Sequence, residues 1–179
     1  MEYGLVGAKL GHSYSVPIHA MLADYDYRLY ERTEEEFIAL MKSRAFRGLN
    51  VTIPYKQLAY RGADALSDAA RAIGSVNTLV VRPDGTLYGD NTDIAGFMAM
   101  ARRAGIDVAG RKAVILGSGG TSLTAQTACR LMGARGIVVV SRRGPVDYEA
   151  LYRDHADAQV LVNTTPVRSE EHTSELQSR

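Results

Sequence analysis

Short apolar runs alternate with segments whose apolar residues recur at helical spacing along the first part of the chain. The runs predict strands at residues 2–6, 25–30, 48–52, 78–82 and 86–90. The segments between and after them predict helices at residues 16–23, 34–43, 56–60, 64–73 and 94–103. Strands and helices that alternate in this way are typical of βαβ units, so we expect an α/β fold.

The first unit of this pattern ends with a predicted hairpin. Pro83-Asp84-Gly85 separates two of the strands and has the residues that a hairpin turn needs. After the next helix, residues 104–110 form a glycine-bounded connection, and we expect the domain boundary near Gly105. The first domain is then 1–104 and the second 105–167. In the second domain, strands at 112–116, 136–140 and 159–163 alternate with helices at 121–132 and 147–154.

Composition and charge narrow the possible partners. Lys and Arg number 21 against 20 Asp and Glu, and a net charge of +1 gives no reason to expect nucleic acid or an anionic membrane. The longest apolar runs are too short to span a bilayer and Met1-Glu2 does not begin a signal sequence, so we expect a cytoplasmic protein with a small-molecule ligand. Cys129 is the single cysteine and no Cys/His cluster has metal-ligand spacing, so neither a disulfide nor a metal is expected.

The end of the chain differs from the rest. Residues 168–179 (RSEEHTSELQSR) carry no apolar periodicity, and 168–178 are identical to the in-frame translation of a common sequencing-library adapter. We expect this segment to be a non-native tail and exclude it from the fold. A polar disordered tail is the alternative.

A glycine-rich loop joins the first strand of the second domain to the helix after it. The residues are Gly117, Ser118, Gly119, Gly120 and Thr121, followed by Ser122. Glycines let a pyrophosphate approach the backbone, and the amides and dipole at a helix N-terminus favour phosphate. The loop therefore predicts a dinucleotide site in a Rossmann-type domain, although the third position of the usual pattern is Ser122 rather than Gly or Ala. A glycine-rich turn without a ligand is the alternative.

The residues after the next strand bear on which dinucleotide is bound. In NAD-specific proteins an acidic residue at this place bonds the ribose 2′-hydroxyl, whereas here the chain has Ser141, Arg142 and Arg143. Two guanidiniums pair with a 2′-phosphate, which an acid would repel. The sequence thus favours NADP over NAD, with two solvated arginines as the alternative.

Four polar clusters lie at ends of predicted strands in the first half. They are GHSYS at 11–15, NVTIPYK at 50–56, GSVNT at 74–78 and GDNTD at 89–93. Because open parallel sheets bind ligands at the carboxyl ends of their strands, we expect these clusters to form a site.

Each cluster also has a plain structural interpretation. Ser15 and Asp93 fit helix N-caps, and Asn77 fits a turn residue that bonds its own backbone. Lys56 fits a solvated surface lysine, although a cation near a helix start opposes the macrodipole and so hints at a function. The residues alone leave both interpretations open.

Taken together and in this order, the motifs GHSxS, NVTIPYK, GSVNT, GDNTD, GSGGTS, SRR and NTTP resemble the shikimate dehydrogenase family, from residue 1 to 167. The resemblance implies an α/β substrate domain followed by a Rossmann-type NADP-binding domain. It also implies an oxidoreductase that reduces 3-dehydroshikimate to shikimate with NADPH, on the chorismate pathway to aromatic amino acids.

The resemblance assigns roles to single residues. Ser13 and Ser15 match serines that bind the substrate carboxylate. Three further positions match contacts to the substrate hydroxyls, namely Thr52, Asn77 and Asp93. Lys56 matches the catalytic lysine, with Asp93 orienting it and the reacting hydroxyl. Thr164 of NTTP joins the cofactor-binding set given above, which comprises Gly117, Ser118, Gly119, Gly120, Thr121, Ser141, Arg142 and Arg143.

The sequence departs from the family at three places. Val16 separates the second serine from Pro17, and Ile94-Ala95 stand where the family has an immediate glycine, which leaves shikimate or quinate open as the substrate. The family continues past Val167 with further nucleotide-domain elements and a substrate-binding glutamine. We therefore expect an incomplete Rossmann domain, and a chain that alone folds poorly and is inactive, with the activity in an intact parent. A folate-linked methylene dehydrogenase and a non-catalytic shikimate- or nucleotide-binding module are the other candidates.

Overall fold

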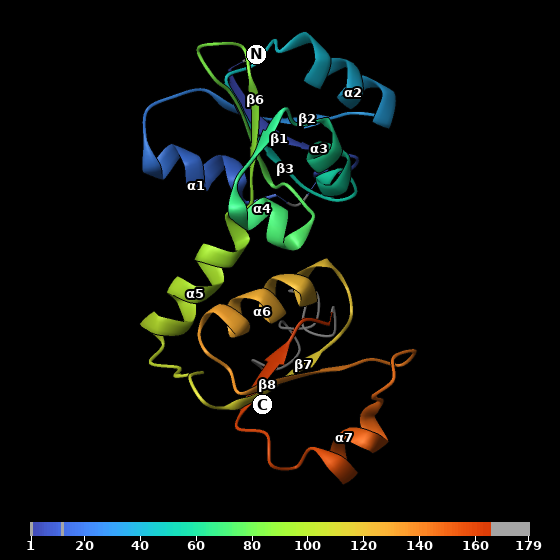
Figure 1. Cartoon of the computed structure of the whole chain (residues 1–179). Coiled ribbons are helices and arrows are strands. Elements are labelled where there is room, and N and C mark those ends of the chain that lie inside the picture. The colour runs from blue at the N-terminus through green and yellow to red at the C-terminus, as the bar shows by residue number, and fades with distance from the viewer. Residues whose placement is uncertain (1, 12, 166–179) are drawn as a thin grey trace, which may run out of the picture. The chain divides into compact units, whose positions relative to one another are not determined.

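The protein consists of two compact units, Met1–Thr92 and Asp93–Arg179, in a computed structural model that describes residues 2–11 and 13–165 (Figure 1). His12, Pro166, Val167 and the predicted tail 168–179 lie outside the described residues. Within the described part of the chain, no helix is both long and apolar enough to cross a membrane.

The first unit is built on one mixed sheet. Its strands are β1 (Tyr3–Gly7), β2 (Tyr27–Glu31), β3 (Gly48–Val51), β4 (Ala65–Leu66), β5 (Thr78–Val81) and β6 (Leu87–Asp90), in the order β2-β1-β3-β5-β6-β4. The pairs β1–β2 and β1–β3 are parallel, as the βαβ pattern predicts, and β4–β6 is also parallel. The pair β5–β6 is antiparallel because the predicted hairpin joins the two strands, and β3–β5 is antiparallel as well.

Four helices accompany this sheet, namely α1 (Ser15–Leu22), α2 (Glu34–Ser43), α3 (Lys56–Gly62) and α4 (Asp68–Ile73). Helix α2 begins with a capping box, in which Thr33 Oγ1 accepts from the Glu36 amide and the Glu36 carboxylate accepts from the Thr33 amide. Helices α2 and α3 lie side by side (Figure 1). Phe37 of α2 packs with Leu49 and Leu79 of the sheet in the main core of the unit.

The predicted helix 64–73 is wrong at its N-terminal end, where the chain forms β4 before α4. The Asp64 amide donates to the Leu87 carbonyl and the Ser67 amide to the Gly89 carbonyl, both 2.9 Å away. Ser67 then caps α4 by accepting from the Ala70 amide. Pairing with β6, which is distant in sequence, overrides the local helical pattern.

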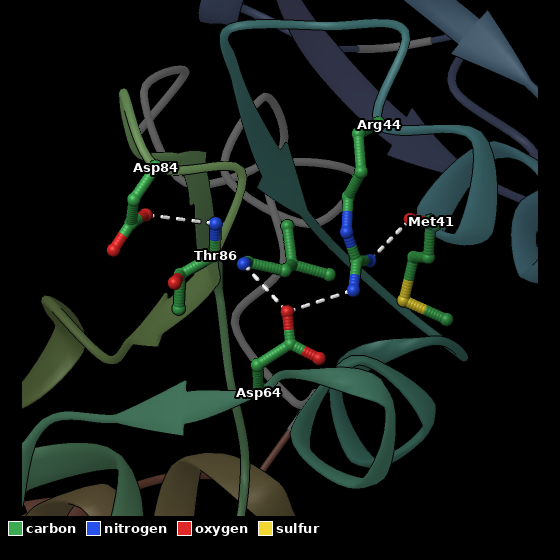
Figure 2. Close-up of polar contacts among 6 residues, drawn as sticks. Met41, Arg44, Asp64, Asp84 and Thr86 are labelled. Carbon is green, nitrogen blue, oxygen red and sulfur yellow. Dashed lines mark hydrogen bonds and ion pairs between the residues drawn. The ribbon is translucent and has the colours of Figure 1, made fainter.

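Asp64 also fixes the end of α2 to the hairpin (Figure 2). Its Oδ2 accepts from the Leu87 amide and from the Arg44 guanidinium, each at 2.8 Å. Arg44 follows α2 in the left-handed region, at φ 54°, and its guanidinium also bonds the Met41 carbonyl. In the turn itself, Asp84 accepts from the Thr86 amide.

The second unit contains a three-stranded parallel sheet in the order β8-β7-β9. Its elements are α5 (Asp93–Arg103), β7 (Lys112–Leu116), α6 (Gly120–Leu131), β8 (Gly136–Val140), α7 (Tyr148–Asp154) and β9 (Val160–Asn163). Helix α5 packs against α6 (Figure 1). The contacts therefore divide the chain before Asp93, whereas the sequence prediction divides it near Gly105 and leaves this helix in the first domain.

Candidate functional site

The polar clusters of the first unit meet at one edge of its sheet. Thr52 directly follows β3, while Asn77 directly precedes β5. Because β5 runs antiparallel to β3 and β6, its start lies at the same edge as their ends. The register places Asn50 opposite Thr78 and Thr78 opposite Asp90. The clusters therefore converge, with GSVNT at the beginning of a strand rather than at a carboxyl end.

Asn77 is the most connected residue at this edge. It is 8% exposed, and its amide and carbonyl bond Asp90 and Val51 of the neighbouring strands. Its side-chain Oδ1 accepts from the Thr92 amide and from the Thr78 hydroxyl, each at 3.0 Å, and its Nδ2 donates to Thr92 Oγ1 at 3.1 Å. Beyond any bond within its own turn, the Asn77 side chain holds the chain at Thr92, fifteen residues further on.

Ser13 and Ser15 lie at the start of α1, and both are half-buried. The helix begins at Ser15 itself, and Tyr14 at the cap position makes no side-chain capping bond. Ser13 Oγ instead accepts from the Ser15 amide at 3.2 Å. The prediction of Ser15 as the N-cap is therefore wrong, since Ser13 is the residue that bonds the first amide of the helix.

Thr52 and Lys56 are positioned by main-chain bonds around the turn between β3 and α3. The Thr52 amide donates to the Val6 carbonyl at 3.0 Å, which ties the turn to β1. Lys56 is the first residue of α3 and is half-buried. Its carbonyl accepts from the Val76 amide at 2.9 Å, so the backbone of Lys56 lies beside the residue that precedes Asn77.

Asp90 and Asn91 reinforce the same edge. Asp90 Oδ1 accepts from the Asn91 amide at 2.7 Å and from the Ser67 hydroxyl. Asn91 is 2% exposed and its Nδ2 donates to the carbonyl and hydroxyl of Ser75. Asp93 is the first residue of α5 and of the second unit, so the helix begins one residue earlier than predicted and Asp93 is not the residue before it.

Two residues that bond toward this edge are missing from the predicted site, and one of them, Tyr27, begins β2 at the other end of the sheet. Tyr27 donates its hydroxyl to Asn50 Oδ1 at 2.7 Å, and Asn50 Nδ2 donates to Thr78 Oγ1 at 3.4 Å. Burial raises the pKa of Tyr27 to about 12, and a hydrogen bond from the Ser15 side chain opposes part of this rise. Asn50 belongs to the NVTIPYK motif. Tyr27 belongs to none of the polar motifs, so the sequence around it gives no sign of a role in the site.

The glycine loop of the second unit has two different parts. Gly117 has φ 105°, and a Cβ there would lie 2.8 Å from Thr164 Oγ1. Thr164 in turn bonds the Leu116 carbonyl through its amide and its hydroxyl. By contrast, Gly119 and Gly120 are exposed and a Cβ on either would meet nothing within 4 Å. Gly117 is thus needed for packing, while the start of α6 is open to a ligand.

Ser118 and Thr121 complete this exposed segment. Gly119 is the N-cap of α6 and supplies no side-chain bond to the helix amides. These amides are the groups that bind phosphate in dinucleotide sites. Ser122, at the third position of the glycine pattern, is fully buried and accepts from Gln126 Nε2 at 3.1 Å.

The loop after β8 presents Arg142 and Arg143 to solvent. The Ser141 amide donates to the Val146 carbonyl at 3.0 Å and closes the loop at its base. Both arginines are exposed, and neither pairs with an acidic residue among residues 2–11 and 13–165. Their charge is therefore not neutralised by the described part of the protein.

These features define a two-domain α/β protein whose second unit has the strand, glycine loop and helix of dinucleotide-binding folds. A family model described as the shikimate dehydrogenase substrate binding domain matches residues 5–79. A shikimate dehydrogenase (NADP(+)) of Thioalkalivibrio sulfidiphilus is 38% identical, over 87% of this chain and 60% of the relative. One from Clostridium perfringens is 35% identical, over 92% of this chain and 68% of the relative.

Solved structures with a similar fold are also shikimate dehydrogenases. Shikimate dehydrogenase 1 from Peptoclostridium difficile matches with a TM-score of 0.81 at 36% identity, over 96% of this chain and 69% of that one. The Thermus thermophilus enzyme in complex with NADP(H) and shikimate matches with a TM-score of 0.79 at 29% identity, over 93% and 69%. The chain belongs to the shikimate dehydrogenase family, and it spans 60% to 68% of the length of the two curated relatives.

Proposed function

We propose that the full-length gene product is an NADP-dependent shikimate dehydrogenase that interconverts 3-dehydroshikimate and shikimate in the cytoplasm. The observation that carries the proposal is the convergence of Ser13, Ser15, Thr52, Asn77 and the backbone of Lys56 at one sheet edge. These are the positions that match the substrate-binding and catalytic residues of the family. The relatives named as NADP-dependent shikimate dehydrogenases support the same substrate and cofactor.

In this proposal the first domain, residues 1–104, binds the substrate. The hydroxyls of Ser13 and Ser15 donate to its carboxylate, and Thr52, Asn77 and Asp93 contact its ring hydroxyls. Hydroxyl and amide groups suit a polyol because each both donates and accepts hydrogen bonds. The bonds that hold Asn77 within the sheet edge reduce the cost of ordering it when substrate binds.

Residues 105–167 form the cofactor-binding part, and the residues present fit NADP. The open backbone at Gly119 and Gly120 leaves room for a pyrophosphate at the α6 amides. Arg142 and Arg143 supply the charge that a 2′-phosphate needs. In this proposal Ser118 and Thr121 contribute from the glycine loop and the start of α6, Ser141 from the loop after β8, and Thr164 from the end of β9.

NADPH, when bound, supplies a hydride to the carbonyl carbon of 3-dehydroshikimate. As the new C–H bond forms, the carbonyl electron pair moves onto oxygen. The Lys56 ammonium stabilises this charge and gives its proton to the oxygen, which yields the hydroxyl of shikimate and a neutral amine. Asp93 is the second acid–base group and orients Lys56 and the reacting hydroxyl. The reverse reaction begins with proton removal by neutral Lys56.

The proposal is tested by the absorbance at 340 nm of the full-length gene product with NADP⁺ and shikimate. Growth of the NADPH signal supports the proposed reaction. Tight shikimate binding without growth indicates the non-catalytic binding module instead. Faster growth with quinate assigns the other substrate, and turnover of methylene-tetrahydrofolate without shikimate turnover assigns the folate-linked class.

A further inference from the structure

A line of hydrogen-bonded side chains leads to the site edge of the first unit. It begins at Tyr27, whose hydroxyl donates to Asn50 Oδ1 at 2.7 Å, and continues from Asn50 Nδ2 to Thr78 Oγ1 at 3.4 Å. The Thr78 hydroxyl then donates to Asn77 Oδ1 at 3.0 Å. The line therefore connects β2, which is the outermost strand on one side of the sheet, with the residue before β5.

The hydrogen bonds of this line all run in one direction. A phenol has one proton, and that of Tyr27 is given to Asn50. Because Asn50 Oδ1 accepts this proton, its NH₂ group must face Thr78, and the Thr78 hydroxyl must then give its proton to Asn77. Each member thus sets the orientation of the next, and such chains strengthen one another by polarisation.

The ring of Tyr27 is held rigidly at the start of the line. Tyr27 is 7% exposed, and its ring stacks on His19 of α1 with centroids 3.7 Å apart and an interplanar angle of 9°. The His19 Nδ1 also bonds the Tyr25 hydroxyl, and this bond is not part of the line. Stacking and burial of the ring therefore hold the Tyr27 oxygen in a position from which it can orient Asn50.

The line ends at a proposed substrate contact. Asn77 Oδ1 accepts from the Thr78 hydroxyl, and Thr78 Oγ1 in turn accepts from Asn50. The orientation of the Asn77 amide therefore depends on the hydrogen bonds that begin at Tyr27.

We propose that Tyr27 is a positioning residue that orients the Asn77 side chain through Asn50 and Thr78 before substrate binds. The inference rests on the proposed function, because only there is Asn77 a substrate contact. Orienting polar groups in advance raises affinity by removing the cost of ordering them in the complex.

The test compares Tyr27→Phe with Tyr25→Phe in the full-length gene product. Each variant removes one hydroxyl from the same aromatic cluster and keeps the ring, but only the Tyr27 hydroxyl belongs to the line. Isothermal titration with shikimate should show a dissociation constant raised about tenfold by Tyr27→Phe and changed less than about twofold by Tyr25→Phe. Equal effects of the two variants, or no effect of Tyr27→Phe, overturn the positioning role.

A double-mutant cycle separates positioning from general loosening of the structure. If Tyr27 acts through Asn77, then Asn77→Ala and Tyr27→Phe together should weaken shikimate binding by less than the product of their separate effects. A combined effect equal to that product contradicts an action through Asn77.

Side-chain amide signals in ¹H–¹⁵N spectra test the line without any ligand. Those of Asn50 and Asn77 should shift in Tyr27→Phe and stay in place in Tyr25→Phe, and unchanged Asn77 signals in Tyr27→Phe overturn the role whatever the binding data show. Absence of shikimate binding by the unmodified protein overturns the proposed function instead, and with it the substrate to which this role refers.

Discussion

Gly117 lies directly against Thr164, where β7 and β9 end side by side. A Cβ on Gly117 would lie 2.8 Å from Thr164 Oγ1 and 3.3 Å from the Thr164 carbonyl carbon and oxygen. Thr164 cannot move away without losing the bonds of its amide and hydroxyl to the Leu116 carbonyl. The first glycine of the loop is therefore fixed by the fold as well as by any ligand.

Replacing Gly117 with alanine should destabilise the protein. The side chain would meet the backbone of Thr164, and φ 105° is a conformation that residues with a Cβ rarely adopt. We expect the free energy of unfolding to fall by about 1–3 kcal/mol, measured by urea denaturation.

Gly119→Ala is the matched control for this variant, because a Cβ there meets nothing and the φ of −81° is ordinary. Its free energy of unfolding should change by less than about 0.5 kcal/mol. Its NADP⁺ affinity should nevertheless fall, since the added methyl group points into the space left for the pyrophosphate. Equal unfolding energies for the two alanine variants would contradict the packing role of Gly117.

Replacing both Arg142 and Arg143 with alanine should weaken NADP⁺ binding much more than NAD⁺ binding. The two guanidiniums have no acidic partner among the described residues, so their charge is available for a 2′-phosphate. Loss of one or two charge-assisted bonds corresponds to a factor of about ten or more in the dissociation constant. Fluorescence titration with each dinucleotide measures the effect, and equal losses for both would rule out recognition of the 2′-phosphate.

Lys56→Ala should lower kcat far more than it weakens shikimate binding. The ammonium acts on the charge that develops at the carbonyl oxygen, so its removal costs the transition state more than the ground state. General acid–base groups typically contribute about 10²–10⁴ in rate. Steady-state kinetics and calorimetry on the same preparation compare the two quantities. Weak binding with normal turnover would contradict the acid–base role.

Ionisation of Tyr27 should make the protein less stable at high pH. Its pKa is about 12 in the folded protein against 10.0 for an unperturbed tyrosine, so between these values the folded state keeps a proton that the unfolded state releases. Stability is therefore complete below pH 10 and decreases as the pH rises toward 12.

The measurement is urea unfolding at pH 9 and pH 11 for the unmodified protein and Tyr27→Phe. Both proteins keep Tyr55 and Cys129, whose pKa values burial also raises, so the difference between them reports on Tyr27. The unmodified protein should lose more stability between the two pH values than the variant. Identical losses would mean that Tyr27 ionises as an exposed tyrosine does.

The local sequence determined most elements of this protein. Apolar periodicity and end signals predicted α2, β7 and β8 with their observed bounds, and Thr33 with Glu36 supplies the capping box of α2. The turn at residues 83–85 predicted the hairpin correctly. These features depend on residues close together in the chain, and their pattern is therefore visible without the fold.

Strand pairing and hydrogen bonds between residues far apart in the sequence were decided by the tertiary structure. Strand β4 exists because residues 64–67 pair with β6, against a helical pattern of their own. The Asn77 side chain bonds Thr92, which is distant in the sequence, and Ser13 rather than Ser15 bonds the first amide of α1.

Tyr27 is the clearest example of a residue whose contacts cannot be predicted from the local sequence. Its contact with the motif residue Asn50 follows from the sheet order, which places β2 and β3 on either side of β1, and its connection to the site follows from the pairing of Asn50 with Thr78. A motif records which residue types occur at which spacing. It does not record which buried hydroxyl lies within hydrogen-bonding distance of a motif residue, because that distance is set by the packing of elements far apart in the chain.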